Sequence, residues 1–213
     1  PPPVTTEPVT AEPPTVPPVV TPDTPTDVPT TGPTVSPPIV TTVPPPITVE
    51  PVTPVVGANL LTNADFEGDG GWVFGDTPFP GAYDSAVVRG GSRAVRLGIT
   101  SGNDAFSFSS IWQRVTIPAE AQQVTLTAQV YPISQDTADS GDVQVIAILD
   151  AGFKVKRKLS VELSNSQTWE TKTFNLSDLA GQTVYIYFSV FNRGRTNLPT
   201  AMYVDDVALT WSN

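Results

Sequence analysis

Histidine and cysteine are both absent from the 213-residue sequence. Without histidine the chain has no imidazole for acid–base catalysis or for metal ligation. Without cysteine it has no disulfide, no thiol nucleophile and no zinc–thiolate site. Carboxylates remain, but those in loops such as 136–142 show no recognisable pairing for glycoside hydrolysis. The sequence therefore predicts a protein that is not an enzyme.

Basic residues are also few, since 11 Lys and Arg face 21 Asp and Glu, for a net charge of −10. No basic stripe could displace the counterions of a nucleic acid, so we expect no nucleic-acid partner. The short run formed by Lys154, Lys156, Arg157 and Lys158 is interpreted as the solvated side of a strand. No apolar run approaches the roughly 20 residues that span a bilayer, so we expect no membrane span.

The first 56 residues contain 19 prolines, 14 threonines and 13 valines, but no aromatic residue, lysine or arginine. Such a segment cannot build a core of its own. All 18 aromatic residues lie in 57–213, a length that suits one domain. The predicted organisation is an extended Pro/Thr/Val-rich tail at 1–56 and a folded domain at 57–213. Low charge, abundant Thr, Ser and Asn, and a chain that begins at Pro1 without Met favour a processed, extracellular or cell-surface protein.

Proline at about every third position should keep the tail close to polyproline II, with a reach on the order of 170 Å. The reach of the tail is therefore several times the diameter of the domain, which is roughly 40 Å. Short β-branched runs between prolines recur at 17–21 (PPVVT) and 37–41 (PPIVT), and weakly at 45–49 (PPITV). Each could add to the sheet edge of a neighbouring copy. The alternative is a mucin-like spacer whose simple composition repeats by chance.

Thr-rich, Pro-rich sequence is typical of O-glycosylated stalks, and N-glycosylation requires the sequon Asn-X-Ser/Thr. The candidate glycosylation residues are Thr5, Thr6, Thr30, Thr31, Thr41, Thr42 and, in the sequon 175–177, Asn175.

From Leu60 onward, short segments alternate with turn signals, and no segment has a convincing helical period. Apolar residues alternate with Thr and Gln over 124–130, as in a half-buried strand, whereas 143–149 is apolar on both faces and suits a central strand. Nine or ten strands at this spacing predict an all-β fold, a two-sheet antiparallel jelly-roll sandwich. Further strands are expected at 185–191, near Val73, and at 86–88, 94–97, 106–117, 154–163, 169–174 and 201–211.

Three segments resemble carbohydrate-binding modules of the galactose-binding-like type. Residues 59–67 (NLLTNADFE), followed by Trp72, are similar to the opening strand of those jelly rolls. Residues 90–97 (GGSRAVRL) are similar to their third segment, and 201–209 (AMYVDDVAL) to their closing strand. The resemblance covers about 58–211 and implies the fold, but such modules serve binding, linking and assembly alike. A jelly roll behind a Pro/Thr-rich tail is also similar in organisation to subunits of glycosylated extracellular filaments.

The resemblance implies a structural calcium ion held by the opening Glu67 and by the closing pair Asp205 and Asp206. Because successive strand residues face opposite sides, one carboxylate of the pair must point inward and needs a cation or several donors. Asp65 and nearby carbonyls could complete the oxygen ligands that calcium requires. Two alternatives stay open, a salt bridge to Arg93 or Arg96 and hydrogen bonds from the backbone.

Exposed aromatic residues could stack on sugar rings or, equally, receive the Pro/Val tail of another copy. Packing in the core or on a sheet face is the alternative use of any one of them. Polar residues that could read sugar hydroxyls lie nearby at Asn192, Arg193, Arg195 and Asn197. The candidates are Trp72, Trp112, Tyr131, Tyr185 and Tyr187.

These features support three functional hypotheses. The leading one is an extracellular structural subunit that polymerises head to tail, its tail packing along or into neighbouring domains, because such heterologous contacts propagate into filaments. The second is a carbohydrate-binding module on a glycosylated stalk of a secreted or surface protein, with a polysaccharide partner. The third is a plain adhesin or spacer domain, which neither polymerises nor binds sugar.

Overall fold

A computed structural model describes residues 57–213, apart from the side chain of Ala138. The predictions for the tail, including its repeats and candidate threonines, lie outside the described residues. The helices within 57–213 are two three-residue 3-10 turns, and neither is long enough to cross a membrane.

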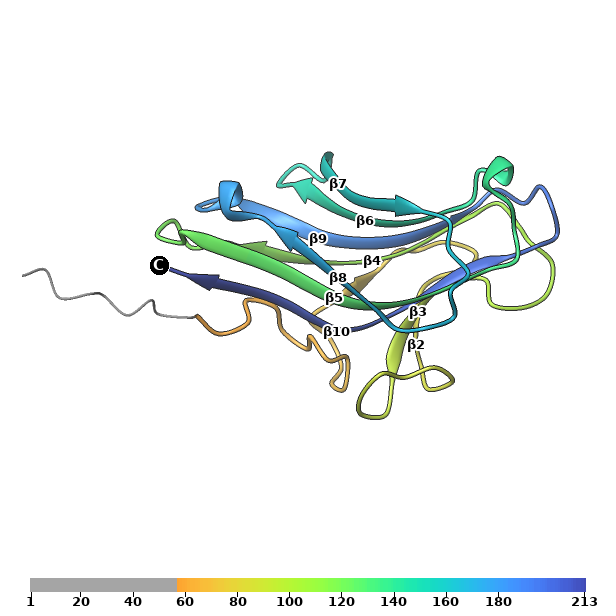
Figure 1. Cartoon of the computed structure of the whole chain (residues 1–213), viewed down its shortest axis with the longest axis horizontal. Coiled ribbons are helices and arrows are strands. Elements are labelled where there is room, and N and C mark those ends of the chain that lie inside the picture. Colours follow the sequence, from red (N-terminus) through yellow and green to blue (C-terminus); the bar gives the residue numbers. More distant parts are fainter. Residues whose placement is uncertain (1–56) are drawn as a thin grey trace, which may run out of the picture. The chain divides into compact units, whose positions relative to one another are not determined.

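The described residues form two five-stranded antiparallel sheets (Figure 1). One, the β10 sheet, has the order β2-β3-β10-β5-β8, and the other, the β9 sheet, has the order β1-β4-β9-β6-β7. The elements are β1 (Val73–Phe74), β2 (Ala82–Asp84), β3 (Ala94–Gly98), β4 (Ser107–Thr116), β5 (Gln123–Ser134), η1 (Ala138–Ser140), β6 (Val143–Asp150), β7 (Val155–Glu162), β8 (Glu170–Asn175), η2 (Ser177–Leu179), β9 (Thr183–Asn192) and β10 (Thr200–Ser212). The predicted all-β jelly-roll sandwich is confirmed.

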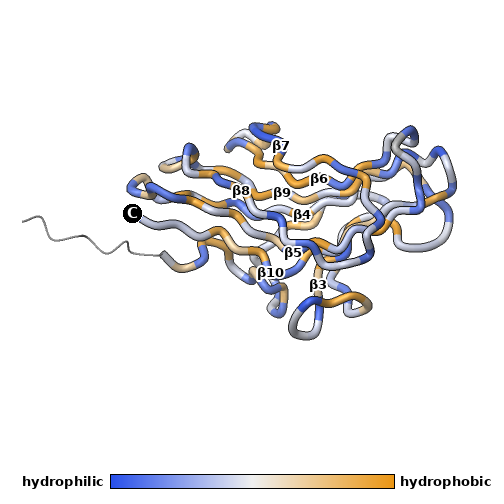
Figure 2. Tube along the Cα trace, in the orientation of Figure 1, coloured by the Kyte–Doolittle hydropathy of each residue, from blue (hydrophilic) through white to orange (hydrophobic). Residues whose placement is uncertain are grey.

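The alternation of apolar and polar residues explains which strand faces are buried. In β5, Val124, Leu126, Ala128 and Val130 are fully buried, and the Thr and Gln residues between them are partly exposed. Strand β6 lies between β9 and β7, and its residues 146–149 are buried on both faces, as the continuous apolar run predicted. Figure 2 shows the apolar colour concentrated along the interior strands, with many connecting loops hydrophilic.

The core lies between the two sheets and is centred on β9. Ile186, Phe188 and Val190 are fully buried there and face the apolar rows of the β10 sheet. Phe66 and Trp72, from the segment before β1, complete this core, since the Trp72 ring lies 5.3 Å from Phe66 and 6.1 Å from Phe188.

Two strand predictions are wrong. Residues 86–88 lie in the loop between β2 and β3, and the short strand in this region is β2. The segment 59–67 forms turns instead of an opening strand, because Asn63 and Phe66 have φ angles of 47° and 57°. Left-handed residues interrupt the extended conformation that a strand requires.

This opening segment is nevertheless attached to β10 by hydrogen bonds. Backbone bonds join the Leu60 N–H to the Leu209 carbonyl and the Val207 N–H to the Ala64 carbonyl. The Asn59 side chain adds to them, because its Nδ2 donates to the Val207 carbonyl at 3.0 Å. Its Oδ1 accepts from the Leu209 N–H at 2.8 Å and from the Leu61 N–H at 3.1 Å. One side chain thus holds two segments that are far apart in the sequence.

We expect Asn59→Ala to lower the free energy of unfolding by about 1–2 kcal/mol, because partly buried backbone groups would lose their partners. Urea denaturation measures this change. Gln122→Ala is the matched control, since it also removes an amide side chain, here from an exposed position. Equal stability of the two variants would contradict the assigned role of Asn59.

Candidate functional site

The outer face of the β9 sheet carries two clusters of aromatic side chains. They arise because β4 and β9 place aromatic residues directly opposite one another, Trp112 against Tyr187 and Phe108 against Phe191. Cross-strand neighbours at such positions touch on the same face of the sheet. We call the first set the Trp112 cluster, which consists of Trp112, Phe153, Tyr185 and Tyr187. The second set is the Phe108 cluster, which consists of Phe106, Phe108 and Phe191.

The Trp112 cluster is a compact group of rings. Trp112 and Tyr187 are stacked, with centroids 6.3 Å apart and an interplanar angle of 23°. Phe153 contacts Trp112 edge-on at 4.9 Å and Tyr185 edge-on at 5.1 Å. The three strand residues are half-buried by these contacts and keep part of their surface open to solvent.

Phe153 reaches the cluster from the hairpin between β6 and β7. Its φ of 62° is left-handed, which is unfavourable for a residue with a bulky side chain. Asp150 holds the turn, because its Oδ1 accepts from the N–H groups of Gly152 at 2.9 Å and Lys154 at 3.0 Å. The result is an aromatic ring that packs on three others and yet stays 45% exposed. A strained, exposed aromatic residue of this kind is typical of a functional site.

The Phe108 cluster lies further along the same two strands. Phe108 and Phe191 are stacked at 4.3 Å, and Phe106 contacts both edge-on. Phe106 is 67% exposed and Phe108 is 48% exposed. The guanidinium carbon of Arg193 lies 5.6 Å from the Phe191 ring centroid, within the range of a cation–π contact.

The two clusters lie in one row on the outer face of the β9 sheet. Phe108 and Trp112 are four residues apart on β4, which corresponds to about 13 Å along a strand. The cross-strand pair between them, Ser110 and Ser189, is small and buried. The face therefore has two groups of aromatic rings, separated by a pair of small side chains that do not project as far.

The structure brings together three of the five predicted aromatic residues, Trp112, Tyr185 and Tyr187. Tyr131 lies on the outer face of the other sheet, where it packs on Trp169 at 5.6 Å. Trp72 is corrected to a core residue: it is 5% exposed, and its Nε1 donates to the Asn63 carbonyl. It offers no surface for a ligand. Phe106, Phe108, Phe153 and Phe191 were not predicted, because only contacts between strands and turns distinguish an exposed phenylalanine from a core one.

Asp205 is the inward carboxylate of the closing pair and is fully buried. Its Oδ2 accepts from the N–H groups of Arg89 at 3.0 Å and Gly90 at 3.3 Å, and its Oδ1 from that of Asp206 at 2.8 Å. Burial raises the pKa of the Asp205 carboxyl, and these hydrogen bonds oppose the rise. Backbone donors, one of the predicted alternatives, therefore satisfy this group.

The other predicted calcium ligands also have protein partners. Asp206 pairs with the Arg89 guanidinium, and Glu67 accepts from Ser92 and from the Arg93 N–H. The bonds from Ser92 hold the pKa of Glu67 below its usual value. Asp65 and Asp206 line an open hollow of about 480 Å³. Within residues 57–213, these four carboxylates do not form a group of three with ligand atoms within 4.8 Å. Calcium at these residues stays a prediction.

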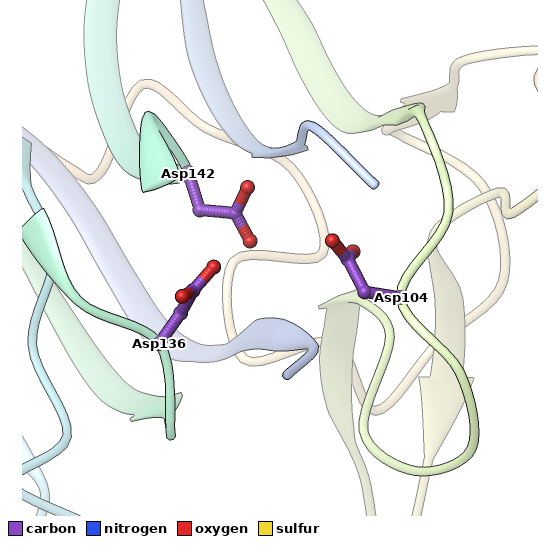
Figure 3. Close-up of side chains that lie close together, drawn as sticks. All are labelled: Asp104, Asp136 and Asp142. Carbon is purple, nitrogen blue, oxygen red and sulfur yellow. The ribbon is translucent and has the colours of Figure 1, made fainter. Parts of the chain in front are cut away.

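A different set of acids does come together, which corrects the view that the loop carboxylates have no pairing. Asp136 and Asp142, from the loop between β5 and β6, meet Asp104 from the loop between β3 and β4 (Figure 3). One ligand oxygen of each lies within 4.8 Å of the others. Sequence reasoning missed this group because Asp104 is distant along the chain and joins it only through the fold.

The predicted N-glycosylation residue, Asn175, is exposed at the end of β8. Its Oδ1 accepts from the Ser177 N–H at 2.9 Å, within the sequon itself. Glycosylation there stays a prediction.

No protein-family model matches the sequence, and no curated protein matches it. Solved structures are similar in fold. One is the structure of TmCBM61 in complex with beta-1,4-galactotriose, with a TM-score of 0.53. The two sequences are 19% identical, and the match covers 72% of this chain and 98% of the TmCBM61 chain. The enzymatically active domain of bacteriophage CBA120 tailspike protein 4 is 11% identical over 72% of this chain, with a TM-score of 0.50. This chain spans only 21% of that protein. A family 16 carbohydrate-binding module is 20% identical over 71% of this chain and 99% of its own, with a TM-score of 0.44. The fold is thus the jelly-roll sandwich of carbohydrate-binding modules.

Proposed function

We propose that residues 57–213 are a non-catalytic polysaccharide-binding module whose binding surface is the outer face of the β9 sheet. The observation that carries this proposal is the Trp112 cluster, in which four aromatic rings converge on a solvent-facing sheet. Groups of exposed apolar side chains on one face often mark recognition surfaces. The likeness of the fold to carbohydrate-binding modules supports the same reading.

Aromatic rings suit sugar recognition because a pyranose presents apolar C–H faces that stack on a π-system. Rigid rings also bring large contact areas at a small loss of conformational entropy. Hydroxyl groups at the rim of the sugar would meet Arg114, which is exposed and adjacent to Tyr185, and Arg193 beside Phe191. Two platforms about 13 Å apart would suit an extended chain of sugars better than a monosaccharide.

The organisation predicted from the sequence, a tail at 1–56 before the domain, is compatible with this function. The tail would serve as an O-glycosylated stalk that carries the module on a secreted or cell-surface protein. The filament hypothesis depends on that tail, which lies outside the described residues, and the similar structures named above give it no support. Polysaccharide binding is therefore the function we infer.

Affinity electrophoresis of the purified chain in gels that contain single polysaccharides tests the proposal. A β-1,4-galactan is the first choice, because a galactotriose is the ligand in the similar structure of TmCBM61. Xylan and mixed-linkage glucan are natural comparisons, since modules of similar fold are described as binding them. We expect the chain to be retarded by at least one of these three polysaccharides. Unchanged mobility in every gel would refute the proposal.

Tyr187→Ala should weaken binding to the retarding polysaccharide about fivefold, because the loss of one stacking ring removes about 1 kcal/mol. Tyr131→Ala is the matched control, since it removes the same side chain from the outer face of the other sheet. It should leave the mobility in the polysaccharide gel unchanged. If Tyr131→Ala weakened binding and Tyr187→Ala did not, the β10 sheet would be the binding face.

A further inference from the structure

The three carboxylates of Asp104, Asp136 and Asp142 form a concentrated negative charge at one end of the sandwich. Figure 3 shows that the three groups point toward one another. Asp104 is 8% exposed and Asp142 is 2% exposed, so water screens their charges poorly. Within residues 57–213, no lysine or arginine forms an ion pair with any of the three. Burial raises the pKa of the Asp142 carboxyl, and the charges of Asp104 and Asp136 raise it further.

Two buried oxygen atoms at this cluster lack a hydrogen-bond partner. One is Oδ1 of Asp104, whose carboxylate is directed at the other two. The second is Oδ1 of Asn192, a fully buried side chain whose Nδ2 donates to Asp142 at 3.3 Å. Buried polar atoms without partners are rare in folded proteins, and an ion or water that satisfies them is one explanation. Both atoms are acceptors, and the Asp104 atom belongs to a carboxylate directed at the other two, where a positively charged ligand would satisfy it.

Donors from the protein hold the remaining oxygen atoms in place. Asp142 accepts from the Arg193 N–H at 2.6 Å and from the Thr200 hydroxyl at 3.0 Å. Asp104 accepts from the Arg195 N–H at 3.1 Å, and Asp136 from the Thr196 hydroxyl at 2.9 Å. Such outer hydrogen bonds orient carboxylates in metal sites. The arrangement is therefore built around the point at which the three groups converge.

We propose that Asp104, Asp136 and Asp142 bind a calcium ion, with the Asn192 amide at its margin. Only oxygen ligands are present, which excludes the softer metals that prefer histidine or cysteine. Three carboxylates could supply several of the six to eight oxygen ligands that calcium takes, with water completing the shell. Magnesium requires a smaller, near-ideal octahedron, and loop residues are less suited to it. This site is separate from Glu67, Asp205 and Asp206.

The ion would join two loops that are far apart in sequence, and a third loop donates hydrogen bonds to its ligands. Asp104 precedes β4, Asp136 and Asp142 precede β6, and the donors to them come from the loop between β9 and β10. The Phe108 cluster lies beside these loops: Phe106 follows Asp104 by two residues, and Arg193 from the loop between β9 and β10 lies over Phe191. If the proposed polysaccharide function holds, calcium would therefore fix one end of the binding face. Calcium binding itself does not depend on that function.

Isothermal titration of the EDTA-treated full chain with CaCl2, without any polysaccharide, tests the site. We expect a binding event that depends on Asp104, and a rise in Tm of roughly 5–10 °C at a calcium concentration a hundredfold above the Kd of that event. Asp104→Asn should weaken calcium binding at least tenfold. In EDTA the same variant should unfold at a Tm equal to or above that of the wild type, because one of three repelling charges is gone. A merely structural carboxylate would lower the Tm in EDTA.

Two controls make the test specific. Asp139→Asn removes the same charge from an exposed position of the 136–142 loop and should leave calcium binding unchanged. Glu67→Gln disrupts the other predicted calcium residues and should also leave this binding event intact. Wild-type protein without calcium binding, or binding that Glu67→Gln abolishes and Asp104→Asn does not, would overturn the proposal. Stronger binding of MgCl2 than of CaCl2 would overturn the choice of metal.

Discussion

Replacing Phe188 by alanine should lower the free energy of unfolding by about 3–5 kcal/mol, the usual result of removing a fully buried phenylalanine. Phe188 is 0% exposed and lies on β9, which is paired with β4 on one side and β6 on the other. Its ring contacts Trp72, so the substitution would also loosen the segment before β1. Because strands on both sides hold the backbone, we expect the cavity to collapse only in part. Equilibrium denaturation in urea measures the loss.

The adjacent residue supplies the control for this prediction. Tyr187 points to the outer face of the same strand, and Tyr187→Ala should change the free energy of unfolding by less than about 1 kcal/mol. The two variants should therefore separate stability from binding: Phe188→Ala lowers stability, and Tyr187→Ala lowers polysaccharide affinity. Comparable stability of both variants would show that β9 does not have the register described above.

Trp112→Ala should reduce polysaccharide affinity about thirtyfold, which corresponds to about 2 kcal/mol and is typical of a central aromatic anchor. Trp112 carries the largest ring of the cluster and contacts both Phe153 and Tyr187. Its removal would take away a stacking surface and also release the neighbours that support it. The effect should for this reason exceed that of Tyr187→Ala. Isothermal titration or gel retardation measures the change in Kd.

Trp169→Ala is the matched control for Trp112→Ala. Trp169 is a half-buried tryptophan on the opposite outer face, where it packs on Tyr131. Its replacement should affect stability to a similar extent and leave polysaccharide binding unchanged. If both tryptophan variants bound normally, the aromatic face of the β9 sheet would have another use. Docking of a Pro/Val segment from a second copy would then be the hypothesis to examine, by electron microscopy of the full chain.

The strands were largely predictable because strand periodicity is local. The alternation over 124–130 and the apolar run over 143–149 each correspond to a strand with the predicted pattern of burial. The wrong prediction for 59–67 involves backbone angles that composition does not report. Asn63 and Phe66 adopt positive φ values and turn the segment that resembled an opening strand. The same effect at Phe153 creates the most exposed part of the Trp112 cluster, and no periodic pattern could have indicated it.

The sequence by itself determined the fold class, the inward and outward rows of the long strands, and the exclusion of histidine and cysteine chemistry. These properties follow from residue types and from the two-residue period of a strand. Only the tertiary structure decided which aromatic side chains lie together. Trp112 lies opposite Tyr187 on the β9 sheet, Tyr131 lies on the outer face of the other sheet, and Trp72 lies in the core. It likewise brought Asp104 to Asp136 and Asp142. Contacts between distant loops depend on how the strands are ordered in two sheets, and that order is a property of the whole fold.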